Sequence, residues 1–463
     1  MRRPLAPLLG LLFVLGVALV ARLREPLSSP ILGAEDPFLH MVQAWDLAQG
    51  RGLPAHYPPG FPALLAPFTF LGARAFYALA RWGPPLLGVA EAGGVWLLAR
   101  RHLGAWPALA GGLLVALMPE NVFRTDLLFP TALDLALLPF LFLATLRAVE
   151  GSRAALAVAA GLGALLLVSH PWVVALLVLT LGTFTLGVLA RRHRRRALPL
   201  AAATATGCAA LVAALTFLPG TWNPTSALLR HAGPRLVSLV LHPSTLFPLP
   251  QYVDLPAMLT WGALVFAAAG ALCVLAAPRP LGLLALTWTA LLLPIVLVDW
   301  FGVWFIPHRT VAYLSVGVAL LGAHAVERLM ELAPPRLRAP TGALACALAL
   351  GLVLPAGLAV QPWYRIVEPN DVQAWKDLDA KGARWTVTTS WQSAAGDRAT
   401  TGRDVVFNPS FFTDAHARDA ALAKHPDAVV LVDRHAKENG LPTGFLASWR
   451  KVGQWGDVTA YTR

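Results

Sequence analysis

The sequence predicts an all-α polytopic membrane protein whose C-terminal part is a small α/β domain. Of the 463 residues, 57% are hydrophobic and only 13% are charged, and the mean hydropathy is +0.60. Soluble domains do not bury that much apolar surface. Apolar runs of about 20 residues, the length that crosses a bilayer, recur along most of the chain. Beyond residue 362 the composition turns polar and nearly charge-balanced, and every lysine lies there.

The apolar runs predict about eleven transmembrane helices. The first run follows Arg2 and Arg3 and is longer than the apolar core of a signal peptide, so we expect an uncleaved helix. The proline-rich stretch 57–68 is too short to cross, and we expect it at the membrane interface. The predicted spans lie near residues 4–22, 81–99, 104–118, 127–147, 154–169, 171–190, 198–218, 256–277, 281–299, 305–327 and 341–361.

The distribution of arginine predicts the orientation in the membrane. A cytoplasmic N-terminus places most arginine clusters inside, including the run RRHRRR at 191–196, as the positive-inside rule requires. These clusters also account for the net charge of +12, so no nucleic-acid partner is expected. An odd number of spans then makes 1–361 a transmembrane domain and 362–463 an extracytoplasmic domain. The richness in Ala, Leu and Arg, with few lysines, points to a GC-rich prokaryotic genome, and we expect the protein in the inner or plasma membrane of a prokaryote.

The polar C-terminal part shows the alternating pattern of an α/β domain. We expect one helix from a cap at Asn370 through Ala380 and a second from a cap at Thr413 to Lys424. The segments RWTVTT, RDVVF and DAVVLVD are expected to be strands.

The first outer loop, GAEDPFLHMVQAWDLAQGRG, predicts a helix with an acidic start. Asp36 is expected at the N-cap, and Gly50 or Gly52 at the end of the helix. Glu35 and Asp36 are adjacent acids where the helix dipole stabilises an anion, so Asp36 is a candidate general base or cation ligand. The alternative is that Asp36 only caps the helix. His40 lies one turn on, on the same face, as a substrate contact or as a structural histidine.

Two further outer loops carry polar residues. Arg124 and Asp126 lie at the mouth of the fourth span, and Asp134 lies about two turns further in. We expect these carboxylates to help bind a metal or a sugar, or else Arg124 and Asp126 to form an interfacial ion pair. His308 and Arg309 stand at the outer end of the tenth span, where a guanidinium suits a lipid head group or a specific phosphate.

Taken together, these motifs resemble the GT-C superfamily of membrane glycosyltransferases. The segment Asp36-Pro37-Phe38 with His40 is similar to the first acidic motif of oligosaccharyltransferase catalytic subunits, which often reads D-P-aromatic-x-H. The stretch YPPGFP is similar to a segment of protein mannosyltransferases and lipid A aminoarabinose transferases. The resemblance covers the layout of essentially the whole chain.

The resemblance implies a polyprenyl-phosphate or polyprenyl-diphosphate sugar as donor and an inverting transfer to an extracytoplasmic glycan, lipid or protein. Asp36, beside Glu35, would be the general base or a ligand of Mn²⁺ or Mg²⁺ together with Asp126, and Arg309 would hold the departing phosphate. That division suits the chemistry, since a carboxylate activates the nucleophile and a guanidinium stabilises the leaving phosphate. The residues expected to bind substrate are His40, Tyr57, Arg124, Asp126, Asp134, His170, His308, Arg309 and Trp391.

Three alternatives to this function stay open. Transfer of a glycan from a lipid diphosphate to protein is one, although the nearest match to the sequon-binding W-W-D-Y-G motif, around Trp391 and Gly396, lacks its Trp-Asp pair. A transporter or lipid flippase with an outer domain is the second. The third is a non-catalytic GT-C relative that serves as a partner subunit.

Overall fold

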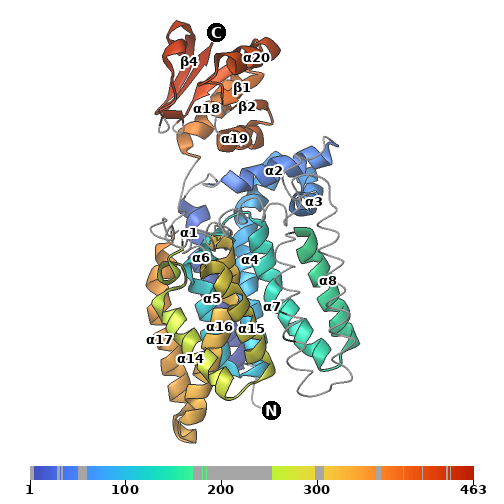
Figure 1. Cartoon of the computed structure of the whole chain (residues 1–463), viewed down its shortest axis with the longest axis vertical. Coiled ribbons are helices and arrows are strands. Elements are labelled where there is room, and N and C mark those ends of the chain that lie inside the picture. Colours follow the sequence, from blue (N-terminus) through green and yellow to red (C-terminus); the bar gives the residue numbers. More distant parts are fainter. Residues whose placement is uncertain are drawn as a thin grey trace, which may run out of the picture. The chain divides into compact units, whose positions relative to one another are not determined.

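The computed structural model divides the chain into two compact units (Figure 1). The first unit comprises Met1–Arg24, Pro54–Phe61 and Gly83–Gln361, and the second comprises Glu25–Leu53, Pro62–Trp82 and Pro362–Arg463. The structure describes residues 5–28, 32, 35–50, 60–169, 180, 184, 253–297, 307–360, 367–388, 391–408, 410–433, 436–437 and 440–463.

The first unit is built from helices. Among the described residues, five helices are long and apolar enough to cross a membrane, or six if α5 and α6, bent by 63° at their junction, form one span. The predicted spans inside the described residues coincide with helices. Those at 171–190, apart from residues 180 and 184, and at 198–218 lie outside the described residues, and the total of about eleven stays a prediction. The helices are α1 (Leu5–Ser28), α4 (Ala73–His102), α5 (Ala105–Leu117), α6 (Pro119–Asp126), α7 (Pro130–Val149), α8 (Arg153–Ser169), α13 (Leu255–Leu259), α14 (Trp261–Ala276), α15 (Pro280–Leu297), α16 (Pro307–Leu332), η4 (Pro335–Leu337) and α17 (Arg338–Ala359).

Helix α16 lies at the centre of this unit and packs against α5, α14, α15 and α17. Small residues allow the helices to approach closely, as is usual in membrane bundles. A Cβ atom at Gly270 of α14 would overlap the backbone of Leu321 on α16, and one at Gly357 of α17 would overlap the backbone of Leu117. The first contact holds the central helix α16, which carries two of the predicted site residues, close to α14, and the second holds α17 close to α5.

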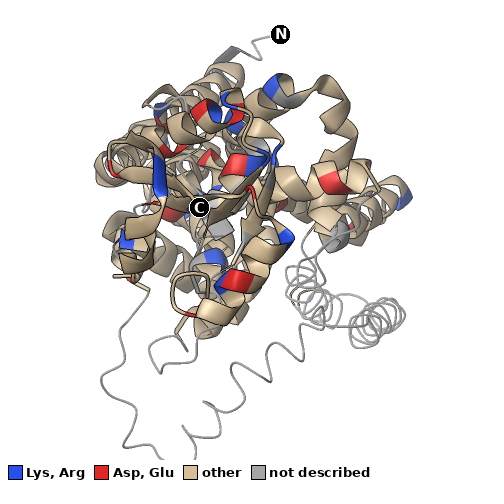
Figure 2. Cartoon of the chain, turned by 90° about the horizontal axis from the view of Figure 1, so that it is seen from above, with Lys and Arg blue, Asp and Glu red and all other residues tan. Residues whose placement is uncertain are grey.

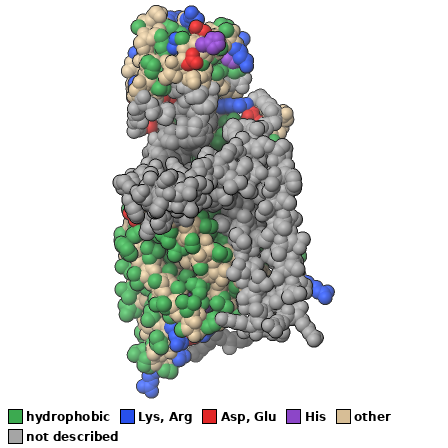
Figure 3. All heavy atoms as spheres, in the orientation of Figure 1, with side chains coloured by type: hydrophobic (Ala, Val, Ile, Leu, Met, Phe, Trp, Pro, Cys, Tyr) green, Lys and Arg blue, Asp and Glu red, His purple; other side chains and the backbone are tan. Residues whose placement is uncertain are grey.

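Several helix faces expose large apolar side chains, as expected of surfaces that meet lipid. Figure 2 shows acidic and basic residues as scattered segments on a mostly uncharged chain. Figure 3 shows hydrophobic side chains gathered over the helical part of the molecule. The exposed residues include Leu8, Leu9, Leu12 and Phe13 on α1, Val265, Leu272 and Leu275 on α14, and Leu344, Leu348 and Leu352 on α17.

The second unit contains the first outer loop. Its helix α2 (Glu35–Ala48) confirms the predicted helix, which is followed by Gly50 in the left-handed conformation at φ +70°. The helix begins at Glu35, so Asp36 lies within its first turn, and the expectation of Asp36 as N-cap was wrong. The stretch after it forms only the short helices α3 (Gly60–Leu65) and η1 (Ala66–Leu71), in agreement with a segment too short to cross.

The same unit contains the predicted C-terminal α/β domain. Its five strands lie in the order β2-β1-β3-β5-β4, with β2, β1 and β3 parallel and the β4–β5 hairpin antiparallel. Side chains alternate across β1: Val387 lies in the apolar core with Leu422, and Thr386 bonds to Asp397 on the other side. The elements are α18 (Pro369–Ala380), β1 (Trp385–Thr388), α19 (Trp391–Thr401), β2 (Asp404–Phe407), α20 (Ala415–Lys424), β3 (Val429–Val432), η5 (Gly444–Ser448), β4 (Arg450–Trp455) and β5 (Val458–Thr462).

Both helix caps predicted in this domain were wrong by one or two residues. Glu368, and not Asn370, is the N-cap of α18, because its side chain forms a capping box with Asp371 and the following proline takes the first helical position. Asp414, and not Thr413, caps α20, because its side chain accepts hydrogen bonds from the backbone N–H groups of His416 and Ala417.

Candidate functional site

Helix α2 has an apolar face and a polar face. On the apolar face, Phe38 packs against Tyr77 with ring centroids 6.4 Å apart, and Trp45 meets Phe76 edge-on at 5.3 Å. Positions 36, 40 and 43 are spaced by one and two helical turns and share the opposite face. The aromatic contacts therefore direct the acidic motif away from the start of α4.

The polar face of α2 begins at the positive end of the helix dipole, where a carboxylate is stabilised as an anion. Glu35 and Asp36 form the first helical positions there, and their side chains lie outside what the structure describes. His40 is fully buried, and Gln43 is 2% exposed. Sequence reasoning had not singled out Gln43, although its spacing from His40 offered the signal.

Helix α19 of the C-terminal domain packs against α2 within the second unit. Arg398 on α19 forms an ion pair with Asp46 on α2, with Nη2 and Oδ1 2.6 Å apart. Trp391, the predicted acceptor contact, is the first residue of α19, and its side chain lies outside the described residues. The helix had not been predicted, because this segment was interpreted as a degenerate sequon-binding motif.

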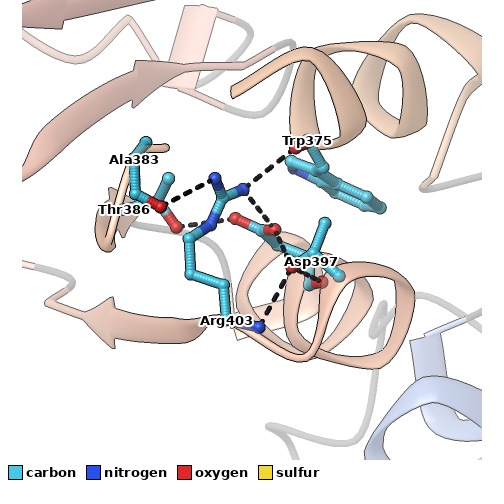
Figure 4. Close-up of polar contacts among 6 residues, drawn as sticks. Trp375, Ala383, Thr386, Asp397 and Arg403 are labelled. Carbon is cyan, nitrogen blue, oxygen red and sulfur yellow. Dashed lines mark hydrogen bonds and ion pairs between the residues drawn. The ribbon is translucent and has the colours of Figure 1, made fainter. Parts of the chain in front are cut away.

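A buried ion pair fixes α19 to the rest of the domain (Figure 4). Arg403 donates to Oδ1 of Asp397 at 2.6 Å and to the carbonyl oxygen of Trp375 at 3.2 Å. Thr386 on β1 donates to the other carboxylate oxygen of Asp397 at 2.6 Å, and the hydroxyl of Thr401 donates to Oδ1 at 3.0 Å. Asp397 adjoins Arg398, so this network also positions the residue that binds α2.

In the first unit, Asp134 on α7 lies at the centre of a buried cluster. It accepts hydrogen bonds from Ser169 of α8 at 2.5 Å and from the hydroxyl of Tyr313 on α16 at 2.7 Å. Arg309, half-buried one turn before Tyr313, is close enough to both side chains to interact electrostatically. The structure thus brings together the predicted residues Asp134 and Arg309, and it adds Tyr313.

Helix α6 presents the predicted residues Arg124 and Asp126, both nearly buried. The Nε atom of Arg124 donates to Glu120, one turn earlier, at 2.7 Å, and the guanidinium lies 5.0 Å from the ring of Phe123. The expected alternative of an Arg124–Asp126 ion pair missed Glu120, which is fully buried by the neighbouring helices.

A second polar cluster in the first unit had not been predicted. Arg22 on α1 is fully buried and donates to Thr125 at 2.6 Å, to Asn121 at 2.8 Å and to the carbonyl oxygen of Ala116 at 2.8 Å. Pro119 breaks the helix just after Ala116, and Arg22 satisfies a carbonyl near that break.

Asn121 completes this cluster. Its Oδ1 accepts from Arg22, and its Nδ2 donates to Glu91 of α4 at 2.7 Å and to Ser315 of α16 at 2.9 Å. A glycine at position 88 makes room for the guanidinium, since a Cβ there would overlap Nε of Arg22. The cluster therefore ties α1, α4 and α16 to α6, which carries Arg124 and Asp126.

Other predicted site residues are not tested by the structure. Tyr57, His170 and the side chain of His308 lie outside the described residues. Asp36 belongs to the second unit and Asp126 to the first, so their role as a metal pair stays a prediction. Within the described part of the chain, no three His, Cys, Asp or Glu side chains are placed to hold a metal ion.

Comparisons with known proteins give a family and a fold. A family model described as 6-pyruvoyl-tetrahydropterin synthase related domain, membrane protein, matches residues 86–358. No curated protein matches the chain in sequence.

Three solved structures are similar over nearly the whole chain. The Archaeoglobus fulgidus oligosaccharyltransferase, tethered with an acceptor peptide containing the NVT sequon, is 14% identical with a TM-score of 0.65, over 93% of this chain and 69% of that one. ArnT from Cupriavidus metallidurans, bound to undecaprenyl phosphate, is 14% identical with a TM-score of 0.63, over 98% of this chain and 97% of that one. The mycobacterial arabinofuranosyltransferase AftD is 16% identical with a TM-score of 0.50, over 98% of this chain and 39% of that one. All three are GT-C glycosyltransferases, so the likeness confirms the predicted GT-C fold.

Proposed function

The chain belongs to the family of membrane proteins described as 6-pyruvoyl-tetrahydropterin synthase related, and we propose that it is a GT-C glycosyltransferase. In this proposal it moves a sugar from a polyprenyl-phosphate-linked donor to an acceptor outside the cytoplasm. The observation that carries the proposal is the likeness to ArnT over 98% of this chain and 97% of ArnT, which was solved with undecaprenyl phosphate. A polyprenyl carrier also gives a reason for an enzyme embedded among membrane helices.

The proposed reaction is a single displacement with inversion at the anomeric carbon. Asp36 accepts the proton of the acceptor hydroxyl as its oxygen attacks the anomeric carbon, and the bond from that carbon to the phosphate oxygen breaks. The electron pair leaves with the lipid phosphate. Support for the role of Asp36 comes from its place in the first turn of α2, where the helix dipole favours a carboxylate over a carboxylic acid.

Arg309 is assigned to the leaving phosphate. A guanidinium binds phosphate oxygens with two parallel hydrogen bonds and stabilises the charge that develops on them. Support for this role comes from the place of Arg309 one turn before Tyr313 on α16, whose hydroxyl bonds to Asp134. No step is assigned to a metal ion, and Mn²⁺ or Mg²⁺ dependence is left to the assay.

A donor panel tests the proposal. Purified full-length protein is given polyprenyl-phosphate and polyprenyl-diphosphate sugars, with and without Mn²⁺ or Mg²⁺, and release of the lipid phosphate and the anomeric configuration of the product are measured. We expect turnover with a monophosphate donor and an inverted product. Arg309→Ala should lower turnover about 100-fold or more, whereas Arg328→Ala, an exposed arginine on the same helix, should not. Movement of an intact lipid-linked sugar across vesicles without transfer would support the flippase alternative instead.

Protein glycosylation is a second candidate, favoured by the TM-score of 0.65 to an oligosaccharyltransferase that holds an acceptor peptide. In that case the donor would be a lipid diphosphate carrying a preassembled glycan, and the acceptor an asparagine. Mass spectrometry of glycopeptides from cells that lack the protein separates the two candidates. Loss of modified peptides would favour this candidate, and an unchanged set would favour transfer to a lipid or glycan.

A further inference from the structure

Gln43, on the polar face of α2, is a buried amide whose hydrogen-bonding capacity is unused. The residue is 2% exposed, and among the described residues neither its Oε1 nor its Nε2 atom has a hydrogen-bond partner. Burial without partners opposes folding, because the amide loses its bonds to water and gains none in return. Few buried polar side chains in native proteins are left in this state, so each one calls for a physical reason.

The position of Gln43 on its helix supplies that reason. It lies one turn after His40 and two turns after Asp36, on the face opposite Phe38 and Trp45. The apolar face is occupied by the aromatic rings at the start of α4. The unpaired amide therefore shares its face with the acidic motif that the proposed reaction uses.

Another buried amide in the chain shows the contrasting arrangement. Asn121 on α6 is fully buried, and it accepts one hydrogen bond and donates two, to three different side chains. The chain thus provides full pairing where a buried amide stabilises helix packing. Gln43 has no such partners among the described residues, which leaves its amide available to a ligand.

The chemistry of the amide defines the missing group. A primary amide offers an acceptor at Oε1 and donors at Nε2, so its ligand must both donate and accept. An ionised phosphate only accepts, and it would leave Oε1 unpaired. Two neighbouring hydroxyl groups of a sugar satisfy both atoms, since one hydroxyl donates to Oε1 and the other accepts from Nε2.

We propose that Gln43 binds hydroxyl groups of a sugar substrate and thereby helps to select it. This inference rests on the proposed function and deepens it by assigning a sugar-recognising residue to α2. The hydroxyl groups come from the donor sugar or from a glycan acceptor, and the test below separates these sources.

The test compares two isosteric substitutions in the full-length protein, in a detergent without a sugar head group. Gln43→Met removes the unpaired amide at nearly constant volume, and Asn121→Leu removes the paired one. Without ligand, we expect Gln43→Met to melt at or above the temperature of the wild type, and Asn121→Leu to melt clearly below it. A drop for Gln43→Met as large as that for Asn121→Leu would mean that the amide stabilises the fold, and would overturn the inference.

Ligand probes then identify what the amide binds. Polyprenyl phosphate and the same lipid carrying a sugar are titrated separately, and the additional thermal stabilisation due to the sugar is measured. We expect the sugar to add thermal stabilisation in the wild type. In Gln43→Met this addition should be lost, and the apparent affinity for the sugar-bearing lipid should be about tenfold weaker. The response to plain lipid phosphate should stay the same.

The remaining outcomes separate the inference from the function on which it rests. If the donor increment persists in Gln43→Met but stabilisation by an acceptor oligosaccharide is lost, the sugar bound is that of the acceptor and the inference stands. An unchanged response to both would overturn the inference alone. No response of the wild type to any lipid-linked sugar would overturn the proposed function together with the inference.

Discussion

Helices α6 and α2 each bury a side-chain amide, and the two amides differ in their hydrogen bonding. Asn121 of α6 bonds to Arg22, Glu91 and Ser315, whereas Gln43 of α2 has no partner among the described residues. A saturated cluster stabilises the packing of the helices that contribute to it. An unpaired amide keeps its hydrogen-bonding capacity for a ligand. The difference fits a structural role for α6 and the proposed role of α2 in binding substrate.

The largest expected effect tests the structural role of the α6 cluster. Arg22→Leu removes three hydrogen bonds between helices and leaves Oδ1 of the buried Asn121 without its donor. We expect a loss of about 3–5 kcal/mol of stability, which would prevent recovery of folded protein or strongly lower its melting temperature. Arg24→Leu, an exposed arginine on the same helix, is the control. Equal melting temperatures for the two variants would abolish the contrast between α6 and α2.

A smaller effect is expected from filling the space beside the same guanidinium. A Cβ at Gly88 would overlap Nε of Arg22, so Gly88→Ala should cost about 1–3 kcal/mol through strain. Gly161 on α8 has nothing within 4 Å of its would-be Cβ, and Gly161→Ala should not destabilise the protein. Melting temperatures measured side by side check the pair, and a harmless Gly88→Ala would show that Arg22 can move without loss.

The stability of the second unit should depend on pH through the buried carboxylate of Asp371. Burial, with the nearby Asp433 and Asp457, raises the pKa of Asp371 to about 7. The protonated form is therefore favoured in the folded state, and this contribution is complete below the unfolded pKa of about 4 and is lost as the pH rises through 7. The slope of stability against pH in that window is about 1.4 kcal/mol per pH unit. The free energy of opening of α18, obtained from hydrogen exchange in the full chain, should therefore fall as the pH rises from 4 to 7.

The neutral variant Asp371→Asn is the control for this pH effect, since its side-chain oxygen still accepts the hydrogen bond from the Glu368 N–H. We expect the free energy of opening of α18 to vary less between pH 4 and 7 in this variant than in the wild type. An equal dependence in both proteins would place the titrating group elsewhere.

The smallest effect concerns the ion pair that joins α2 to α19. Arg398 and Asp46 are partly exposed, so reversal of either charge should cost about 0.5–1 kcal/mol, and the double reversal should recover part of it. The measurement is a double-mutant cycle of melting temperature and of apparent donor affinity. Additive effects of the two reversals would show that the bridge does not hold α2 in place.

Local patterns in the sequence predicted the elements that depend on local interactions. The acidic motif with Gly50 predicted α2, and runs of β-branched residues predicted β1, β2 and β3. The β4–β5 hairpin was missed although Gly456-Asp457 between two strand-like runs is a turn signal.

The long-range clusters could not be predicted in the same way. Arg22 and Asn121 are 99 residues apart, and Asp134 and Tyr313 are 179 apart, so that only the packing of the helices brings them together. The predicted first span, residues 4–22, ends at Arg22, and no local pattern in the sequence indicates that this side chain is buried. Its burial depends on Gly88 and on the helix break at Pro119, whose consequences become visible only in three dimensions.

The most direct test of the account replaces the carboxylate at the start of the polar face of α2. Donor turnover is compared for wild type, Asp36→Asn and Asp254→Asn, with and without Mn²⁺ or Mg²⁺. Asp254 is the matched control, because it caps α13 by accepting a hydrogen bond from the Ala257 N–H. The side-chain oxygen of an asparagine can accept the same hydrogen bond. We expect Asp36→Asn to lower turnover by about 100-fold or more, and Asp254→Asn to leave it unchanged. Full turnover by Asp36→Asn would reduce Asp36 to a residue that begins a helix, and would contradict the assignment of catalysis to α2.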